Sequence, residues 1–259
     1  MNKEYDKTPS FYNDEETFSK FLKKTSFYTA LQNNLSKCIS FAKPKKILEL
    51  GSATGETSMK VAKEFPSSTV VGVDMRENIV EVANNAAKRE NVKNVSFKQG
   101  DMSQYVKNPI DADFVYMLYS FHHIVDPEEN KINFFKDAYQ NLKKGAYVCI
   151  AEGFIPEDVS LTDEAPIVEL WRVRSQEAYA TVFWNSLSDL TKDSLDKATA
   201  IANYSKEKEF EAGLLVAKRD SEYLVKASWV EKVAREVGFK VVINQPVNNI
   251  ADRIILLQK

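Results

Sequence analysis

Short apolar runs alternate with amphipathic stretches through the middle of the chain. The apolar runs have the length and residue types of β-strands: KILELG, TVVGVD, NVSFKQGD, DFVYML and AYVCIAE. Between them, three stretches carry apolar residues at helical spacing: 56–65, 77–90 and 128–142. Strands that alternate with helices predict a parallel sheet with helices on both faces, wound by right-handed crossovers.

The pattern is different at the two ends of the chain. Residues 1–41 predict two helices that end before Pro44. Near the other end, Ser228 and Glu231 have the spacing of a capping box, and Gly238 is typical of a helix end. Two strand-like runs complete the chain: KVVINQPV and RIILLQK. Because a short connection joins them, we expect them to pair as antiparallel neighbours.

The alternation of strands and helices stops after Glu152. Residues 156–225 look helical, and we expect them to form a lid, because they leave the carboxyl end of the fifth strand. The chain therefore predicts an α/β fold: a doubly wound, mostly parallel seven-stranded sheet with an antiparallel last strand, N-terminal helices and a helical lid insertion. Its predicted parts are a helical cap (1–43), a Rossmann-like core (44–155), the lid (156–225) and the completion of the core (226–259).

The charge balance narrows the range of functions. The chain has 35 basic and 37 acidic residues, a formal charge of -2, without the basic excess typical of a nucleic-acid binder. No apolar run approaches the roughly 20 residues that a membrane span needs. The two cysteines, Cys38 and Cys149, lack metal-ligand spacing and predict buried, reduced thiols. We expect a cytoplasmic protein with no metal, no nucleic-acid partner and no membrane contact; a homodimer is an open option.

A glycine-containing turn, Glu49-Leu50-Gly51-Ser52-Ala53-Thr54-Gly55, lies between the first strand and its helix. Gly51 and Gly55 permit a tight turn and a close backbone approach by a ligand. The helix that follows presents free N–H groups and a positive dipole end to a carboxylate or a phosphate. Many α/β proteins have such a turn, so the motif alone does not identify the ligand.

Two acidic residues at strand ends add to this turn. Asp74 ends the second strand, where a carboxylate can accept hydrogen bonds from both hydroxyls of a ribose. Asp101 follows the third strand, where it can accept from the adenine amino group, and Met102 offers a backbone N–H to the ring. Ala53 stands where a dinucleotide fingerprint needs its middle glycine, and its methyl group obstructs a pyrophosphate more than a methionine tail. These features favour S-adenosylmethionine over NAD.

The motifs together resemble those of class I S-adenosylmethionine-dependent methyltransferases. Five of them come in that family's order over about residues 44–153: ELGSATG, VGVD, QGDM, YSFHHI and NLKKGAYVCIAE. The last helix and strand pair resembles the family's ending, whereas Ala53 replaces a glycine and the long insertion matches no particular subfamily. The resemblance implies that Gly51, Ser52, Ala53 and Gly55 hold the methionine part of the cofactor and that Glu49 supports their loop. It further implies adenosine contacts by Asp74, Met75, Asp101 and Met102, and backbone contacts by Leu118 and Tyr119 to the cofactor's amino group.

Methyl transfer from a sulfonium needs few catalytic groups, because alignment and desolvation carry most of the rate. His122 and His123 follow the fourth strand at the carboxyl-end crevice, where one of them can act as a general base or the pair can shape the loop. Glu152 ends the fifth strand at the same crevice, where it can orient a substrate or pair with a lysine.

Aromatic and basic residues of the N-terminal segment and the insertion are candidates for the substrate pocket: Tyr12, Tyr28, Trp171, Arg172 and Tyr179. At helical spacing, such side chains are also common in cores and interfaces. The leading hypothesis is a methyltransferase that acts on an O, N or C atom of a small molecule. Two alternatives remain: a protein that binds S-adenosylmethionine without methylating, and an NAD-dependent oxidoreductase.

Overall fold

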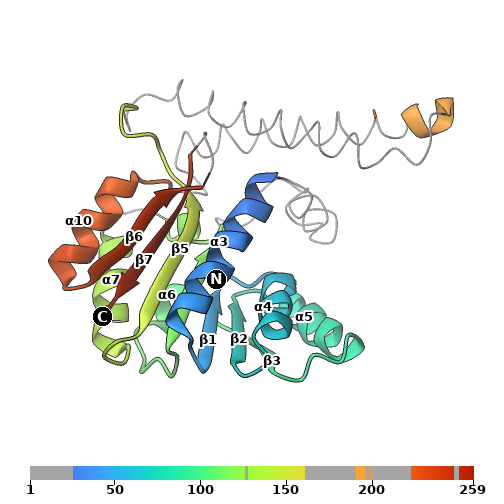
Figure 1. The fold of residues 1–259 in the computed structure, drawn as a ribbon, viewed down its shortest axis with the longest axis horizontal. Helices are drawn as coiled ribbons and strands as arrows, with labels where there is room; N and C mark the ends of the chain where they lie inside the picture. Colours follow the sequence, from blue (N-terminus) through green and yellow to red (C-terminus); the bar gives the residue numbers. More distant parts are fainter. Residues whose placement is uncertain (1–25, 126–127, 161–190, 197–198, 200–222, 248–250) are drawn as a thin grey trace. The chain divides into compact units, whose positions relative to one another are not determined.

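The computed structural model describes residues 26–125, 128–160, 191–196, 199, 223–247 and 251–259. The chain divides into two compact units, and the larger one consists of residues 30–157 and 225–259. All seven strands belong to this larger unit (Figure 1). The predicted domain limits stay predictions, since most of 1–43 and 156–225 lies outside the described residues.

The seven strands form one sheet in the order β3-β2-β1-β4-β5-β7-β6. Their bounds are Lys46–Leu50 (β1), Thr69–Asp74 (β2), Val95–Gln99 (β3), Phe114–Leu118 (β4), Tyr147–Gly153 (β5), Lys240–Pro246 (β6) and Asp252–Gln258 (β7). The first five strands are parallel, and β7 runs antiparallel to both of its neighbours. The predicted mostly parallel sheet and the antiparallel final pair are confirmed.

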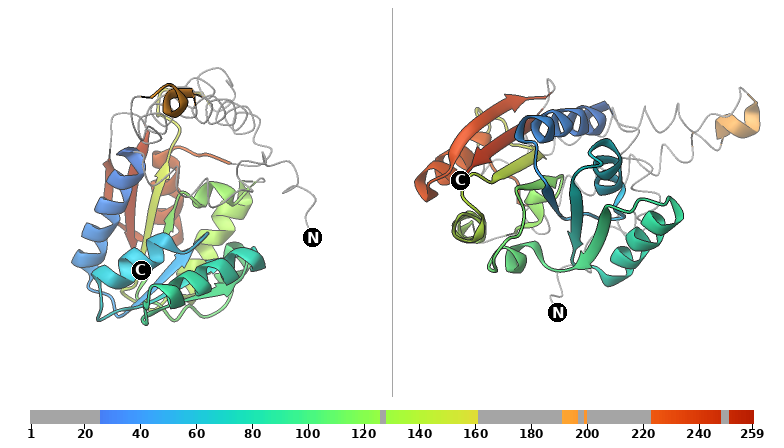
Figure 2. Two further views of the ribbon diagram at one scale, coloured as in Figure 1. Left: turned by 90° about the vertical axis from the view of Figure 1, so that its right-hand side faces the viewer. Right: turned by 60° about the horizontal axis from the view of Figure 1, so that its bottom comes forward.

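Helices cover both faces of the sheet (Figures 1 and 2). Their bounds are Ser26–Ala42 (α3), Glu56–Glu64 (α4), Glu77–Arg89 (α5), Met102–Tyr105 (α6), Glu129–Asn141 (α7) and Ala227–Val237 (α10), with a 3-10 turn at Phe121–His123 (η2). The chain moves outward from β1 to β3 and then in the opposite direction from β4 to β5. Right-handed crossovers therefore place α4 and α5 on one face and α7 on the other.

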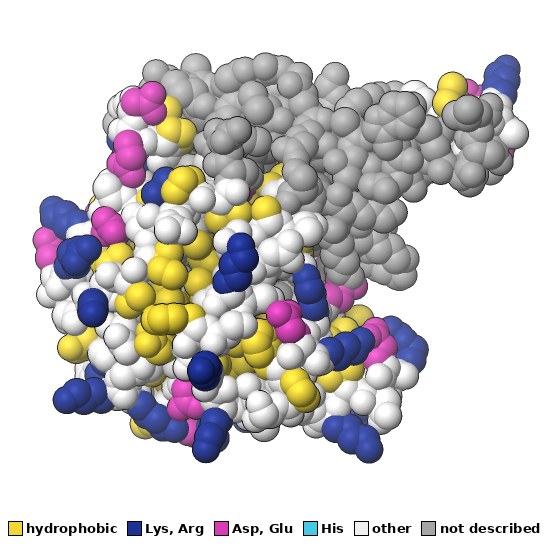
Figure 3. Space-filling view, viewed as in Figure 1, with side chains coloured by type: hydrophobic (Ala, Val, Ile, Leu, Met, Phe, Trp, Pro, Cys, Tyr) yellow, Lys and Arg dark blue, Asp and Glu magenta, His cyan; other side chains and the backbone are white. Residues whose placement is uncertain are grey.

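Burial explains why the apolar runs become central strands. All five residues of β4 are buried, as are the last four of β1, because helices cover these strands on both faces. On α3, Leu31, Leu35 and Ile39 repeat every four residues and form a buried stripe. The edge strand β6 is different: its central residues are only half-buried. On the face of Figure 3, apolar side chains gather over β5–β7, while Lys and Arg side chains are spread out among acidic ones.

The predicted capping box at Ser228 was wrong. Helix α10 begins at Ala227, two residues earlier than a box with Ser228 as the Ncap residue requires, and the actual Ncap residue, Lys226, makes no side-chain cap. Instead, the Glu157 carboxylate accepts from the backbone N–H of Ser228 at 3.0 Å and from its hydroxyl at 2.5 Å. Glu157, which lies 71 residues earlier in the chain, thus accepts the hydrogen bond from the Ser228 N–H that was expected to go to Glu231. The predicted end at Gly238 is confirmed, with a left-handed φ of 119°.

None of the helices in the described parts of the chain is long and apolar enough to cross a membrane.

Candidate active site

The order of the strands reverses between β1 and β4, because β1 leads to β2 on one side and β4 lies on the other. Ligands of doubly wound sheets bind at the carboxyl ends of such strands. Here Gly51 follows β1 with φ 81°, and Ser120 follows β4. A Cβ atom on Gly51 would overlap the Cβ of Ser120 and lie 2.8 Å from its Oγ. The Ser120 hydroxyl also donates to the carbonyl of Leu50 at 2.6 Å, so the two strand ends are in direct contact.

Asp74, at the end of β2, holds the glycine turn in place. Its buried carboxylate accepts from the N–H of Ala53 at 2.9 Å through one oxygen and from the N–H of Arg76 at 3.1 Å through the other. The Arg76 side chain lies beside it, with Nε 3.5 Å from Oδ1. Ala53 itself has φ 42°, a left-handed conformation that costs a residue with a Cβ about 1 kcal/mol. The structure therefore joins Asp74 to the turn, as the predicted shared site requires.

Glu49 lies beneath the same turn, inside the sheet. Its carboxylate accepts a short hydrogen bond from the hydroxyl of Ser58 on α4. Burial raises the pKa of Glu49 to about 8, while hydrogen bonds from Ser58 and Tyr116 act in the opposite direction. The residue thus ties β1 to α4 as a buried, protonated acid at neutral pH. Three residues after Glu49, Ser52 has a buried hydroxyl with no hydrogen-bond partner among the described residues.

The turn after β3 lies beside Asp74 and the glycine turn. The N–H of Gly100 donates to the carbonyl of Asp74 at 2.9 Å. Asp101 caps the short helix α6, with Oδ1 accepting from the N–H groups of Ser103 at 2.8 Å and Gln104 at 3.0 Å. The side chain of Met102 lies 3.4 Å from the position of a Cβ on Gly51. The predicted adenine-binding turn and the predicted methionine-binding turn are therefore neighbours.

The end of β4 has an unusual backbone. Leu118 is buried, and Tyr119 has φ 51° while its N–H donates to the carbonyl of Ala151 at 3.0 Å. The Tyr119 hydroxyl makes a short hydrogen bond to the fully buried carboxylate of Asp252 on β7. Asp252 was missed in the sequence, because nothing local relates it to a tyrosine 133 residues earlier.

His122 and Glu152 form a buried pair at this edge of the sheet. The His122 ring nitrogen Nδ1 lies 2.9 Å from Oε2 of Glu152, and Oε1 accepts from the N–H of Gly153 at 2.9 Å. With Nδ1–H donated to the carboxylate, a neutral imidazole keeps Nε2 as its proton acceptor. His123 is exposed, with its ring centre 4.1 Å from that of His122. The geometry thus distinguishes the two histidines, which the sequence could not.

Lys131 is a further member of this cluster that sequence reasoning missed. It is completely buried on α7, and its ammonium donates to the carbonyls of Phe121 at 2.7 Å and Ile124 at 2.6 Å. Burial lowers the pKa of Lys131 to about 7, against the attraction of Glu152, which raises it. A signal was present in the sequence: Lys131 precedes the buried residues of α7 by three, four and seven positions, which places it on the apolar face (Phe134, Phe135 and Ala138).

The described residues include two other predicted site residues. Met75 follows β2 and is 39% exposed, open to a ligand, and Tyr28 is half-buried on α3. The remaining pocket candidates lie outside the described residues: Tyr12, Trp171, Arg172 and Tyr179. In the described part of the chain, no three His, Cys, Asp or Glu side chains are grouped as metal ligands would be.

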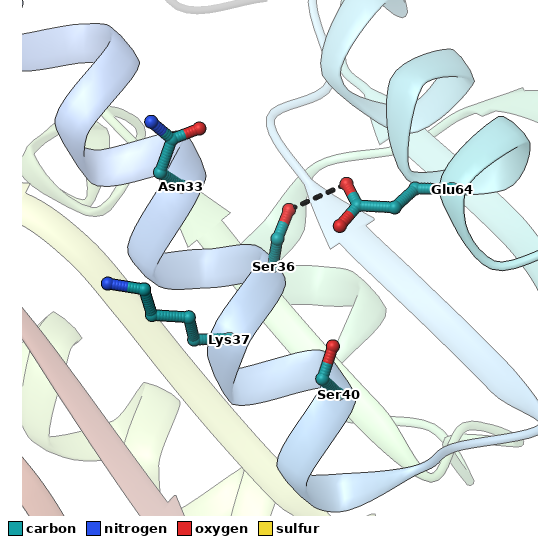
Figure 4. Close-up of a pocket in the computed structure, with 5 residues that line it drawn as sticks. All are labelled: Asn33, Ser36, Lys37, Ser40 and Glu64. Atoms are coloured by element: carbon teal, nitrogen blue, oxygen red, sulfur yellow. Dashed lines mark hydrogen bonds between the residues drawn. The ribbon is translucent and has the colours of Figure 1, made fainter.

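A polar groove elsewhere on the surface lies between α3 and α4 (Figure 4). Asn33, Ser36, Lys37 and Ser40 of α3 line it with Glu64, whose carboxylate accepts from Ser36 at 2.8 Å. Glu64 ends α4, whereas the glycine turn precedes the start of that helix. The groove is therefore at the opposite end of α4 from the candidate active site.

Residues 42–189, more than half of the chain, match the model of a family described as a methyltransferase domain. The chain belongs to this family. The match confirms the resemblance to class I S-adenosylmethionine-dependent methyltransferases that the motifs indicated. The erythromycin 3''-O-methyltransferase of Saccharopolyspora erythraea is 28% identical to this methyltransferase domain over 130 residues, which are 50% of this chain and 41% of that enzyme.

Solved methyltransferases share the fold. Human N-acetylserotonin methyltransferase, solved with S-adenosylmethionine, matches with a TM-score of 0.57 and 15% identity, over 96% of this chain and 58% of that one. An O-methyltransferase family 2 protein of Planctomyces limnophilus, solved with apigenin, matches with a TM-score of 0.51 and 16% identity, over 83% of this chain and 50% of that one. This chain thus spans about half the length of these relatives.

Replacing Gly51 tests the contact between the two strand ends. We expect Gly51→Ala to lower the free energy of unfolding by about 1 kcal/mol for the left-handed backbone and by about 1–3 kcal/mol more for the overlap with Ser120. Gly145→Ala is a matched control, because Gly145 has φ 83° and nothing within 4 Å of its Cβ position. Urea unfolding of both variants gives the comparison, and equal losses would contradict the close approach.

Glu49 predicts a pH dependence of stability. The folded protein keeps this proton up to a pKa of about 8, whereas the unfolded chain releases it near the ordinary value of 4.5. Raising the pH from 5 to 7 therefore favours unfolding, by up to about 1.4 kcal/mol per pH unit. We expect wild type to lose stability over this range relative to Glu49→Gln in urea unfolding. Parallel stability curves for the two proteins would show that Glu49 ionises freely in the fold.

Proposed function

We propose that this chain is an S-adenosylmethionine-dependent methyltransferase that transfers a methyl group to an oxygen, nitrogen or carbon atom of a small molecule by in-line displacement. The observation that carries the proposal is the meeting of three strand ends at one switch point. Gly51, Asp74 and Met102 converge there, next to the His122–Glu152 pair. The family membership supports the type of reaction, and the site supports the residues assigned to it.

The residues present fit the cofactor. Gly51 lets the turn after β1 pass directly against Ser120, and a residue without a side chain in this turn suits close backbone contact with the methionine part. The carboxylate of Asp74 accepts two backbone N–H groups and has capacity for about two more hydrogen bonds, as many as the two hydroxyls of a ribose donate. Met75 is exposed and can pack on adenine, and in our proposal Asp101 and Met102 bind the adenine edge.

The bound cofactor supplies an electrophilic methyl group. The chain then has to hold the acceptor atom in line with it and exclude water. In our proposal, His122 removes the proton of the acceptor atom through Nε2, and Glu152 keeps the ring in the required tautomer and orientation through Nδ1. His123 is exposed, whereas His122 is buried beside Glu152, so His123 is the weaker candidate for a base.

Two observations support a small-molecule substrate. Both the erythromycin enzyme and the human enzyme have names that specify small acceptors, and this chain has no excess of basic residues. The pocket residues proposed from the sequence stay proposals: Tyr12, Tyr28, Trp171, Arg172 and Tyr179. The cytoplasmic location and the homodimer likewise stay predictions, which fractionation and light scattering can test.

The binding part of the proposal is tested at Asp74. Asp74→Asn removes the charge and one of the two acceptors, so we expect the affinity for S-adenosylhomocysteine to fall about 10- to 100-fold. Asp111→Asn is the control, because Asp111 is an exposed acid that pairs with Lys46 at the start of β1. Isothermal calorimetry measures both affinities. If wild type binds NADH and not S-adenosylhomocysteine, the proposed function fails.

The chemical part is tested at His122. A screen for S-adenosylhomocysteine release with small phenols and amines first identifies an acceptor. With that acceptor, we expect His122→Asn to lower kcat about 100-fold or more and to remove the rise of kcat with pH, because a general base contributes that much. His123→Asn should change kcat less than about threefold, on the same principle. Equal effects of the two substitutions would argue that the pair shapes the loop only.

A further inference from the structure

Lys131 binds both ends of the turn that carries the histidines. Its ammonium donates to the carbonyl of Phe121, the first residue of η2, and to that of Ile124, the residue just after it. It also lies 4.3 Å from the centre of the Phe121 ring. The Lys131 side chain therefore bridges the first and last residues of the turn 121–124, and His122 lies within that turn.

The same turn is fixed on its other side by Glu152. The backbone N–H of His122 lies 3.4 Å from Oε2 of Glu152, the oxygen that accepts from the His122 ring. Glu152 and Lys131 also attract each other electrostatically. Three buried ionisable groups from α7, η2 and β5 thus form one connected cluster, and the turn lies between the opposite charges.

A lysine is a costly choice for this position. A buried ammonium loses its hydration, and a well-packed apolar side chain is often neutral or stabilising in its place. The neighbouring positions on the buried face of α7 are Phe134, Phe135 and Ala138, so an apolar residue would match the pattern of the helix. The pKa of about 7 shows how strongly the site disfavours the charge. Packing therefore does not account for Lys131, whereas its bonds to the histidine turn do.

We propose that Lys131 is a positioning residue for the methyl-transfer site, which holds the turn 121–124 and lowers the proton affinity of His122 beside Glu152. This inference rests on the proposed function, in which His122 is the base. It adds a fully buried residue on a different helix, which acts through the turn.

The test uses the two histidines, which are the only ones in the chain and simplify the spectrum. Ring carbon and nitrogen resonances of labelled full-length protein give the pKa of each ring and the nitrogen that carries the proton; His123→Asn assigns them. In wild type, we expect the Nδ1–H tautomer at His122. Lys131→Met removes a cation beside the Glu152–His122 pair, so the pKa of His122 should rise by about half a pH unit or more, while Glu152 keeps the proton on Nδ1.

Three variants serve as controls. Lys136→Met removes an exposed lysine from the same helix and should leave both histidines unchanged. Lys131→Arg keeps the charge and the donors and should restore most of the wild-type spectrum. Lys131→Gln keeps N–H donors without the charge. If circular dichroism shows that Lys131→Met does not fold, Lys131→Gln must show the same rise in the pKa of His122.

The outcomes separate this inference from the proposed function. An unchanged pKa of His122 in folded Lys131→Met or Lys131→Gln would overturn the role of Lys131 alone. With an acceptor from the screen, kcat of Lys131→Met should fall about 10- to 100-fold at an unchanged affinity for S-adenosylhomocysteine. Full activity of His122→Asn would overturn the base assignment and, with it, this inference.

Discussion

The distance between neighbouring strands is the constraint on which the site depends. Parallel strands lie about 4.8 Å apart, so the turn that leaves β1 must pass the turn that leaves β4 within that spacing. Residue 51 has no room for a Cβ because Ser120 occupies the space, and the Ser120 hydroxyl binds the carbonyl of Leu50 across the same gap. The glycine is thus required by the sheet as well as by its own left-handed φ. The same contact brings the glycine turn and the end of β4 together at the switch point.

The carboxyl groups at this edge of the sheet are stabilised in different ways, and each way indicates a role. Glu49 is so deeply buried that it keeps its proton, which suits structural support of the turn. Asp74 stays a hydrogen-bond acceptor for two backbone N–H groups, and Glu152 binds a histidine ring. A cationic cofactor placed here would therefore meet few unscreened negative charges. Because the sulfonium charge is lost as the methyl group is transferred, a strongly anionic site would stabilise the ground state more than the transition state.

The strands, most helix bounds and the turns at Gly51, Asp74 and Asp101 could be predicted because their signals are local: periodicity, glycines and strand-end acids. The features that were missed depend on partners far away in the chain. Glu157 caps α10 from 71 residues away, and Asp252 binds Tyr119 from 133 residues away; no local pattern encodes either contact. Lys131 is an intermediate case, because the helical period places it on the buried face but cannot name the carbonyls it binds.

The turn after β4 makes hydrogen bonds to several elements at once, and these bonds explain how it can hold a strained residue. Ser120 binds β1, Tyr119 binds Asp252 of β7, His122 binds Glu152 of β5, and Lys131 binds the turn from α7. A non-glycine residue with a positive φ, such as Tyr119, persists only where its surroundings over-determine its conformation. In a methyl transfer, where alignment supplies most of the rate, a base on a loose turn would lose the benefit of its position. In the proposed function, where His122 is the base, these anchors have a common role: they fix the direction of one imidazole nitrogen.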